Sequence, residues 1–321
     1  MAVIENSKVA IVGAGSVGTA IAYASLIRGS ARTIALYDIN QPKVEAEVLD
    51  LQHGALFTGH SQIVGGANPS VVDGAHVVVI TAGAKQDPGQ SRIDLAGTNV
   101  KILQKMLPVL VSHAPNAVFM LVTNPCDVLT VAAQQITGLP DERVMASGTV
   151  LDTSRLRQLL AVRAGVSPSS VHADIVGEHG DTEFALWSQA RIGPIPILDW
   201  KPSSAAAEHQ PFSHAELEDI TDRVRHAAYA VIEGKGATNY AIGVSATRII
   251  EAILNDENAV LPVSIVHRGH HGIDGVALSI PSIVNARGVA RVLEVRMSAH
   301  EERQMHASAE ALRKVQHDLG L

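Results

Sequence analysis

Apolar runs and helical patterns alternate along the first 146 residues. Short apolar runs predict buried strands at residues 8–12, 33–37, 77–81, 117–122 and 144–146. Between them, apolar positions at helical spacing predict helices at residues 19–27, 42–54 and 94–110. Strands that alternate with helices predict a parallel, doubly wound sheet covered on both faces, which is an α/β fold of the Rossmann type.

The pattern changes after residue 146. Helical spacing continues at 151–164, 213–233 and 239–254, and β-type runs occur at 171–176, 260–266 and 276–280. Two Ser-x-x-Glu segments, Ser213 to Glu216 and Ser298 to Glu301, have the form of a capping box, and the second opens a charged C-terminal helix. We therefore predict a Rossmann domain over residues 1–146 and an α+β domain over residues 147–321.

A glycine-rich turn joins the first predicted strand to the first helix, with the sequence Gly13-Ala14-Gly15-Ser16-Val17-Gly18. Gly13 permits the tight turn, Gly15 lets the backbone approach a pyrophosphate, and Gly18 lets the helix pack close to the strand. Asp38 ends the next strand, where it can accept hydrogen bonds from the adenosine ribose, and its charge would repel a 2′-phosphate. The turn therefore favours NAD over NADP, although a plain buried turn with a solvated Asp38 is the alternative.

Polar and glycine residues follow the ends of further strands. Gly83 and Asn124 lie two residues past the ends of predicted strands, and Gly13 and Asp38 directly follow two others. Ligands of doubly wound sheets bind beyond the carboxyl ends of the strands, so these positions define an expected ligand edge. Residues 82–92 are rich in small and turn-forming residues and predict a loop whose polar side chains can reach over that edge.

Composition narrows the class of protein. The chain has 321 residues, is 46% hydrophobic and 18% charged, and has a formal net charge of −7, which describes a folded globular protein without a general affinity for nucleic acid or anionic membranes. The single cysteine, Cys126, excludes an internal disulfide and fits a reducing compartment. The uncharged run at 9–27 contains the glycine turn, so a strand, turn and helix explain it better than a membrane helix or signal sequence. We therefore expect a cytoplasmic protein.

One of the 15 histidines, His179, lies in Gly177-Glu178-His179-Gly180-Asp181. Histidine exchanges a proton near neutral pH, and flanking glycines leave room for a ligand. Asp152 and Arg155 are three residues apart and share one helix face. A carboxylate can stabilise an imidazolium, and an arginine can bind a substrate carboxylate through two hydrogen bonds. The alternative is an ordinary ion pair within the helix, because spacing alone does not place either residue beside His179.

In combination, these motifs resemble those of the NAD-dependent L-lactate/malate dehydrogenases, from about Lys8 to the C-terminal helix. Ala82-Gly83-Ala84, Gly89-Gln90-Ser91-Arg92, Thr123-Asn124-Pro125 and Leu151-Asp152-Thr153-Ser154-Arg155 belong to the same resemblance. It implies that His179 is the general acid–base, which gives a proton to the keto oxygen as hydride arrives from NADH. It also implies that Asp152 holds the imidazole, that Arg155 binds the substrate carboxylate, and that Arg92 polarises the carbonyl when its loop closes.

The resemblance implies further contacts. Asn124 would orient the substrate, and Thr238 would line the substrate pocket. The expected cofactor contacts are Gly13, Gly15, Val17, Gly18, Asp38, Lys43, Gly83, Ala84, Val122, Asn124 and Ser147.

Gln86 bears on the choice of substrate. In malate dehydrogenases of this family, an arginine at the matching position pairs with the second carboxylate of oxaloacetate, whereas Gln86 is neutral. A buried carboxylate without a cation would cost about 2 kcal/mol or more, so the pocket favours pyruvate. The neighbouring Lys85 weakens the argument slightly, since its amine could swing in, and Gln86 could be only a polar loop residue. We predict reduction of pyruvate to (S)-lactate, the fermentative end step of glycolysis; the alternatives are a malate dehydrogenase and a protein that binds NAD without turnover.

Two cations suggest regulation. Arg157 is two residues past Arg155 and points to another side of the helix, and His172 is seven residues before His179, which in an unbroken strand places the two histidines on opposite faces. In bacterial L-lactate dehydrogenases, residues matching Arg157 and His172 form an inter-subunit site for fructose 1,6-bisphosphate. The resemblance therefore implies a homotetramer activated by this sugar phosphate, with two ordinary surface cations as the alternative.

Two remaining features are interpreted as structural. His267, His270 and His271 crowd one turn without thiols or acids nearby in sequence, so a polar hairpin tip is favoured over a metal site, and no metal is expected. Cys126 is interpreted as a small buried residue, because the implied mechanism needs no nucleophile.

Overall fold

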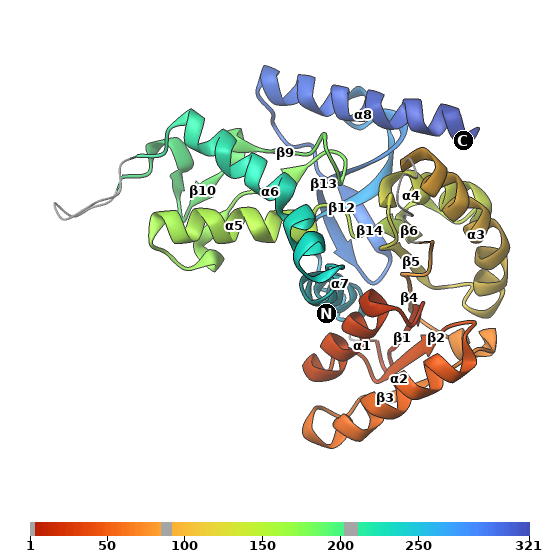
Figure 1. Cartoon of the computed structure of the whole chain (residues 1–321). Helices are drawn as coiled ribbons and strands as arrows, with labels where there is room; N and C mark the ends of the chain where they lie inside the picture. The colour runs from red at the N-terminus through yellow and green to blue at the C-terminus, as the bar shows by residue number, and fades with distance from the viewer. Residues whose placement is uncertain (1–3, 85–91, 202–210) are drawn as a thin grey trace.

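The computed structural model describes residues 4–84, 92–201 and 211–321, and of Arg92 only the backbone. A nine-stranded sheet runs through the molecule in the order β14-β13-β12-β6-β5-β4-β1-β2-β3 (Figure 1). Its six strands from the first half of the chain are β1 (Lys8–Val12), β2 (Thr33–Tyr37), β3 (Gln62–Gly66), β4 (Val77–Ile80), β5 (Val118–Leu121) and β6 (Val144–Ala146). Neighbours among these six are parallel, in the order 3-2-1-4-5-6 of dinucleotide-binding sheets. The predicted parallel α/β fold is therefore confirmed.

Three later strands extend the same sheet in the antiparallel sense. They are β12 (Ala259–Arg268), β13 (Asp274–Asn285) and β14 (Gly288–Val292). Ser264 of β12 pairs with Ala146 of β6, so the second half of the chain is joined to the parallel sheet through its edge. The strands exceed the predicted runs because their polar ends also pair, as Arg268 does with Asp274.

The described chain also contains eight α-helices, five short strands and several short 3₁₀ helices. The helices are α1 (Ser16–Arg28), α2 (Gln41–Gly54), α3 (Arg92–His113), α4 (Cys126–Thr137), α5 (Val150–Ala164), α6 (His214–Lys235), α7 (Tyr240–Leu254) and α8 (Ala299–Leu319). The short strands are β7 (Val171–His172), β8 (Ile175–Val176), β9 (Phe184–Ala185), β10 (Arg191–Ile192) and β11 (Ile195–Pro196). Within the described residues, none of the helices combines the length and apolar character needed to cross a membrane.

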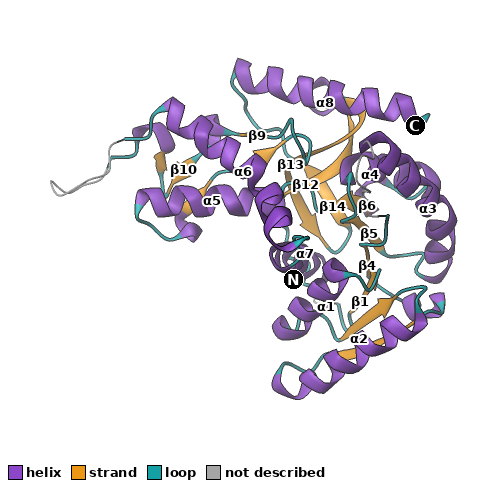
Figure 2. Ribbon diagram, viewed as in Figure 1, coloured by secondary structure: helices purple, strands orange, loops and turns teal. Residues whose placement is uncertain are grey.

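Helices bury both faces of the parallel sheet, as Figure 2 shows. Val9 and Ile11 of β1 share a core with residues of α1 and α7, whereas Ala10 and Val12 share another with α3 and α4. Side chains alternate between the faces of a strand, so a strand buried on both sides needs a continuous apolar run. This is the pattern of residues 8–12.

A smaller lobe projects from one side of the sheet in Figure 1 and contains α5, α6 and β10. Its core includes Leu156 and Leu160 of α5 and Leu217, Ile220 and Val224 of α6. The apolar faces of the two helices therefore pack against each other.

Several predicted boundaries were wrong. Strand β3 was not predicted, because it lies at the sheet edge, its Gln62 is exposed and two of its five residues are glycine. Residues 171–176 form two separate strands, interrupted at Ala173 and Asp174, whose carbonyls accept hydrogen bonds from Arg157 and from the backbone of Leu186. The alternation argument for His172 and His179 assumed an unbroken strand and therefore does not hold.

Helix ends also differ from the predictions. Arg92 was expected in a loop but is the first residue of α3, which continues through Pro108 to His113. Ser298 and Glu301 form the predicted capping box. Ser213 caps α6 by accepting a hydrogen bond from the backbone of Glu216, but the carboxylate of Glu216 binds Arg163 instead of closing the box.

Candidate active site

The glycine turn after β1 is shaped by contacts that exclude side chains. Gly13 has a φ of 108°, and a Cβ there would lie 2.8 Å from the backbone nitrogen of Ala82. A Cβ on Gly18 would lie 1.9 Å from the carbonyl oxygen of Gly13. Gly15 differs, because a Cβ there would meet no described atom within 4 Å. Gly13 and Gly18 are therefore required by packing, whereas Gly15 leaves open space at the N-terminus of α1, which fits a pyrophosphate.

Asp38 is held beside this turn. Its Oδ2 accepts a hydrogen bond from the backbone of Ala14 at 2.7 Å, and its Oδ1 accepts one from the backbone of Asn40 at 2.9 Å. Each carboxylate oxygen has a second lone pair, so the group can also accept from ribose hydroxyls. Val17 lies half-buried in the first turn of α1, and Lys43 lies exposed in the first turn of α2.

The loops after β4 and β5 are joined by a residue that the sequence did not single out. The buried Asn99 of α3 accepts a hydrogen bond from the backbone of Ala84 at 2.8 Å and donates one to the carbonyl of Asn124 at 3.0 Å. A Cβ on Gly83 would lie 2.4 Å from Thr123, so this approach also requires glycine. A buried asparagine on an otherwise apolar helix face was the available signal.

The ends of β5 and β6 complete the same edge of the sheet. The backbone of Val122 donates to Ile80 at 2.9 Å, and that of Ser147 donates to Leu121 at 3.0 Å. Both residues thus sit one position beyond their strands. Val122 and Ser147 therefore lie at the same edge of the parallel sheet as the turn after β1.

A histidine–aspartate pair lies at the start of α5. Nδ1 of His179 is 2.7 Å from Oδ2 of Asp152, and the other oxygen of Asp152 accepts a hydrogen bond from Arg155. Asp152 is only 2% exposed, whereas the His179 side chain is 25% exposed. The carboxylate of Asp152 therefore forms both the ion pair with Arg155 within the helix and the contact with His179.

Charges around the pair favour its ionised form. Burial lowers the pKa of His179, but the charge of Asp152 and its hydrogen bond outweigh burial and raise the pKa to about 9. Burial raises the pKa of Asp152, but the charges and hydrogen bonds of His179 and Arg155 together outweigh burial and lower the pKa below its usual value. The pair is therefore an imidazolium and a carboxylate at neutral pH.

Two acids near His179 were missed by the sequence analysis. Asp127, in the first turn of α4, accepts a hydrogen bond from the backbone of His179 at 2.7 Å, and burial raises its pKa to about 6. Glu183 precedes β9 and is 3% exposed. The sequence signal for Asp127 was its position three residues after Asn124. Glu183 offered no sequence signal beyond its closeness to His179.

The side-chain donor atoms of Asp152, His179 and Glu183 all lie within 4.8 Å of one another, a spacing that a metal ion can also use. We do not identify these residues as metal ligands. Asp152 is already bonded to both His179 and Arg155, and a cation there would meet the guanidinium of Arg155.

The structure describes only some of the other residues expected to bind the substrate. Thr238 lies half-buried between α6 and α7, and Arg92 begins α3. Gln86 lies outside the described residues.

The cations expected at a regulatory site lie in the smaller lobe. Arg157 donates from Nε to the carbonyl of Ala173 at 2.9 Å, and its Nη2 lies 2.8 Å from a carboxylate oxygen of Asp174. His172 is exposed on β7. The guanidinium of Arg157 is thus hydrogen-bonded to residues of the same chain.

The histidines of the turn between β12 and β13, and Cys126, are described by their burial and packing. His267 is fully buried and donates from Nε2 to the carbonyl of Leu278 at 3.3 Å, and burial lowers its pKa to about 4. The ring of His270 meets it edge-on, 5.7 Å away, in the turn between β12 and β13. Cys126 is buried at the start of α4, and burial raises the pKa of its thiol.

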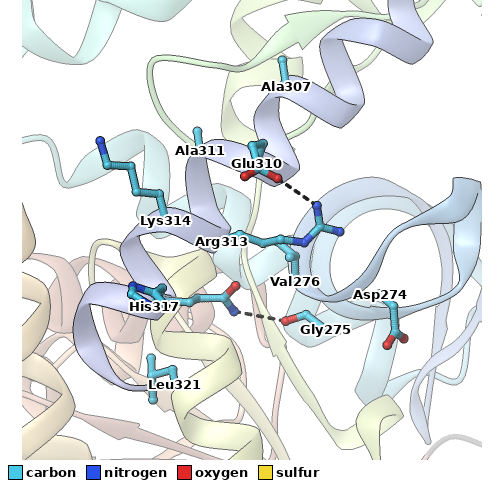
Figure 3. A pocket seen from close by; sticks show the side chains of 11 residues that line it. Asp274, Gly275, Val276, Ala307, Glu310, Ala311, Arg313, Lys314, His317 and Leu321 are labelled. Atoms are coloured by element: carbon cyan, nitrogen blue, oxygen red, sulfur yellow. Dashed lines mark hydrogen bonds and ion pairs between the residues drawn. The ribbon is translucent and has the colours of Figure 1, made fainter.

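A surface pocket of about 900 Å³ lies elsewhere, between α8 and β13 (Figure 3). It is lined by residues of both charges, including Glu310, which pairs with Arg313. It contains none of the residues that surround His179.

Two family models match the chain, one over each half. The lactate/malate dehydrogenase NAD binding domain matches residues 7–146, and the alpha/beta C-terminal domain of the same enzymes matches residues 149–319. The chain belongs to the lactate/malate dehydrogenase family. NAD is accordingly its cofactor.

Relatives within the family are similar over nearly their whole length. An L-lactate dehydrogenase of Bifidobacterium animalis subsp. lactis is 48% identical over 317 residues, covering 99% of this chain and 98% of the relative. One from Synechococcus sp. is 44% identical over 96% of this chain and 98% of its own length.

Two solved structures share the fold. A lactate dehydrogenase from a Medee basin deep-sea metagenome library superimposes with a TM-score of 0.93 at 37% identity, covering 99% of this chain and all of its own. The minor L-lactate dehydrogenase of Enterococcus mundtii, in its ligands-bound form, gives 0.91 at 39% identity and covers 97% of each chain.

Proposed function

We propose that this protein is an NAD-dependent L-lactate dehydrogenase that reversibly reduces pyruvate to (S)-lactate, as the fermentative end step of glycolysis. The observation that carries the proposal is the 2.7 Å contact between His179 and Asp152, with Arg155 bound to the same carboxylate. The relatives named L-lactate dehydrogenase, at 48% and 44% identity, support the choice of reaction.

His179 is the proposed proton donor in the reducing direction. Its Nδ1 is bonded to Asp152, which leaves Nε2 to give a proton to the keto oxygen of pyruvate. Asp152 orients the ring and stabilises the imidazolium, while Arg155, with further N–H groups, binds the substrate carboxylate. Bound NADH supplies the hydride. In the reverse direction, neutral His179 accepts the proton of the lactate hydroxyl.

Further residues are proposed to hold the substrate. Arg92 polarises the carbonyl, Asn124 orients the substrate, and Thr238 lines its pocket. Gln86 leaves the pocket without a cation for a second carboxylate, which favours pyruvate over oxaloacetate.

The cofactor is proposed to lie along the edge of the sheet. The open space at Gly15 admits the pyrophosphate, and Asp38 accepts from the ribose. The other proposed contacts are Gly13, Val17, Gly18, Lys43, Gly83, Ala84, Val122, Asn124 and Ser147. We also propose the division into a cofactor domain over residues 1–146 and a catalytic domain over residues 147–321.

We further propose that the enzyme is a cytoplasmic homotetramer activated by fructose 1,6-bisphosphate at Arg157 and His172. The partial exposure of Arg157 and the exposure of His172 support access by a phosphate. Because Arg157 is bound to Asp174, a phosphate must compete with that carboxylate.

The test follows NADH absorbance with pyruvate and with oxaloacetate, each with and without fructose 1,6-bisphosphate. Faster oxidation with pyruvate supports the proposal, and preference for oxaloacetate would make the enzyme a malate dehydrogenase. Binding of NADH without turnover of any 2-keto acid would leave only a binding protein.

A further inference from the structure

A second buried carboxyl group faces the proposed acid–base pair. Glu183 is 3% exposed, and one of its side-chain oxygens lies within 4.8 Å of donor atoms of both Asp152 and His179. Among the described residues, its Oε1 has no hydrogen-bond partner. A buried ionised carboxylate normally requires compensating hydrogen bonds, so a charged Glu183 would be costly in this position.

The surrounding charges come from three elements. On α5, Asp152 repels a negative Glu183, whereas Arg155, which is bonded to Asp152, attracts it. On α6, Arg225 donates from Nη2 to the backbone carbonyl of Glu183 at 2.9 Å and is paired through Nη1 with Asp222. His179 itself approaches from the loop after β8.

Asp127 of α4 stands on the backbone side of His179. Glu183 therefore has both negative and positive groups as neighbours. Its protonation state depends on which of these charges has the larger effect. Burial, followed by the charge of Asp152, raises its pKa to about 8, against the opposing effects of His179, Arg225 and Arg155. The carboxyl group is thus neutral at neutral pH and ionises as the solution becomes alkaline.

We propose that Glu183 is a positioning residue of the Asp152–His179 pair, neutral during turnover at neutral pH and negatively charged at alkaline pH, where it keeps the imidazole protonated. This rests on the proposed function, because it assigns a consequence for pyruvate reduction. Glu183 acts through His179, and no contact with substrate is required. The second carboxylate thereby extends the pH range in which His179 is a proton donor.

A glutamine at this position separates this role from a structural one. Glutamine has nearly the shape of a protonated glutamate but cannot acquire charge, so Glu183→Gln should match the wild type wherever Glu183 is neutral. A purely structural role predicts a loss at every pH. The matched control is Glu310→Gln, since Glu310 is exposed and lies on α8.

The experiment measures kcat/KM for pyruvate from pH 6 to pH 10 in the wild type, Glu183→Gln and Glu310→Gln. We expect equal values of kcat/KM for the three proteins at pH 6. In Glu183→Gln alone, the decrease of kcat/KM at alkaline pH should begin about one pH unit lower. The proposal would be overturned if kcat/KM of Glu183→Gln decreased at the same alkaline pH as in the wild type. It would also be overturned if kcat/KM were reduced by the same factor at every pH.

A second measurement needs neither a variant nor turnover. The side-chain carboxyl carbons of glutamate are followed by NMR in the wild-type protein as the pH is raised. We expect one glutamate to titrate near pH 8, and the absence of any glutamate titrating above pH 7 would overturn the assignment of Glu183. Failure of the wild type to reduce pyruvate would instead contradict the proposed function and leave the NMR result standing.

Discussion

Oδ2 of Asp152 lies 2.7 Å from Nδ1 of His179, while its Oδ1 accepts a hydrogen bond from Arg155. One buried carboxylate thus fixes the orientation of both the proposed proton donor and the proposed substrate anchor. Because Asp152 and Arg155 are one helical turn apart, α5 sets the spacing between the two functions.

The glycine turn offers a test that separates binding from folding. Gly15→Ala should leave the melting temperature unchanged, because its Cβ meets no described atom and its φ of −80° suits alanine. It should weaken NADH binding about tenfold or more, since the methyl group enters the space proposed for the pyrophosphate. Binding is measured by NADH fluorescence. Unchanged affinity would contradict this position for the cofactor.

Gly18→Ala is the matched control for that variant. Its Cβ would lie 1.9 Å from the carbonyl of Gly13, so we expect a lower melting temperature. The two alanine variants should therefore fail in different assays, and similar melting temperatures would contradict the packing argument.

Substrate choice is predicted to depend on Gln86. Gln86→Arg should shift the ratio of kcat/KM for pyruvate to that for oxaloacetate by about 30-fold toward oxaloacetate, which corresponds to the cost of about 2 kcal/mol for an unpaired carboxylate. Steady-state NADH oxidation measures both values. Lys85→Gln should leave the ratio unchanged; a large loss of oxaloacetate activity in that variant would instead make Lys85 the residual cation.

The competition at Arg157 also leads to a prediction. Asp174→Asn removes the carboxylate that now binds the guanidinium, so the concentration of fructose 1,6-bisphosphate that gives half-maximal activation should fall by about threefold to tenfold. The activation curve at fixed pyruvate measures this. The exposed Asp199 provides the control Asp199→Asn, and an identical curve for Asp174→Asn would place the effector elsewhere.

The buried His267 should make the protein sensitive to acid. Burial lowers its folded-state pKa to about 4, below the ordinary 6.5, so its contribution to stability is present above pH 6.5 and is lost as the pH falls toward 4. Between pH 7 and 4.5 the loss amounts to about 2 kcal/mol.

His267→Gln should remove that loss, because glutamine can donate to Leu278 without titrating. Urea unfolding at the two pH values measures the difference between variant and wild type. The exposed His53 supplies the control His53→Gln, which should keep the wild-type difference. Equal acid sensitivity in His267→Gln and the wild type would show that His267 is not responsible.

The parallel sheet could be predicted because burial on both faces leaves a clear local pattern. Val9 to Val12 are all buried, so the run is apolar throughout. Strand β3 lacks this pattern, because an edge position lets Gln62 face solvent. The break between β7 and β8 depends on Arg157 and Leu186, which are distant in sequence from each other, so no local pattern reports it.

The site could be predicted in part for a similar reason. Asp152 and Arg155 are neighbours on one helix, and their pairing follows from spacing. The approach of His179 to Asp152 joins residues 27 apart, and that of Asp127 to His179 joins residues 52 apart. Such contacts depend on where the loop after β8 lies relative to α4 and α5, which sequence spacing does not encode. Only the family resemblance indicated the first of them.

The pH dependence of pyruvate reduction in the wild type and in Asp152→Asn tests the central claim, that Asp152 makes His179 a protonated donor. With the pKa of His179 raised to about 9, wild-type kcat should stay level through neutral pH and fall as the pH rises past 9. In Asp152→Asn, kcat at neutral pH should fall on the order of 100-fold and the alkaline limb should move toward pH 6.5. An unchanged limb and an unchanged kcat would contradict the account.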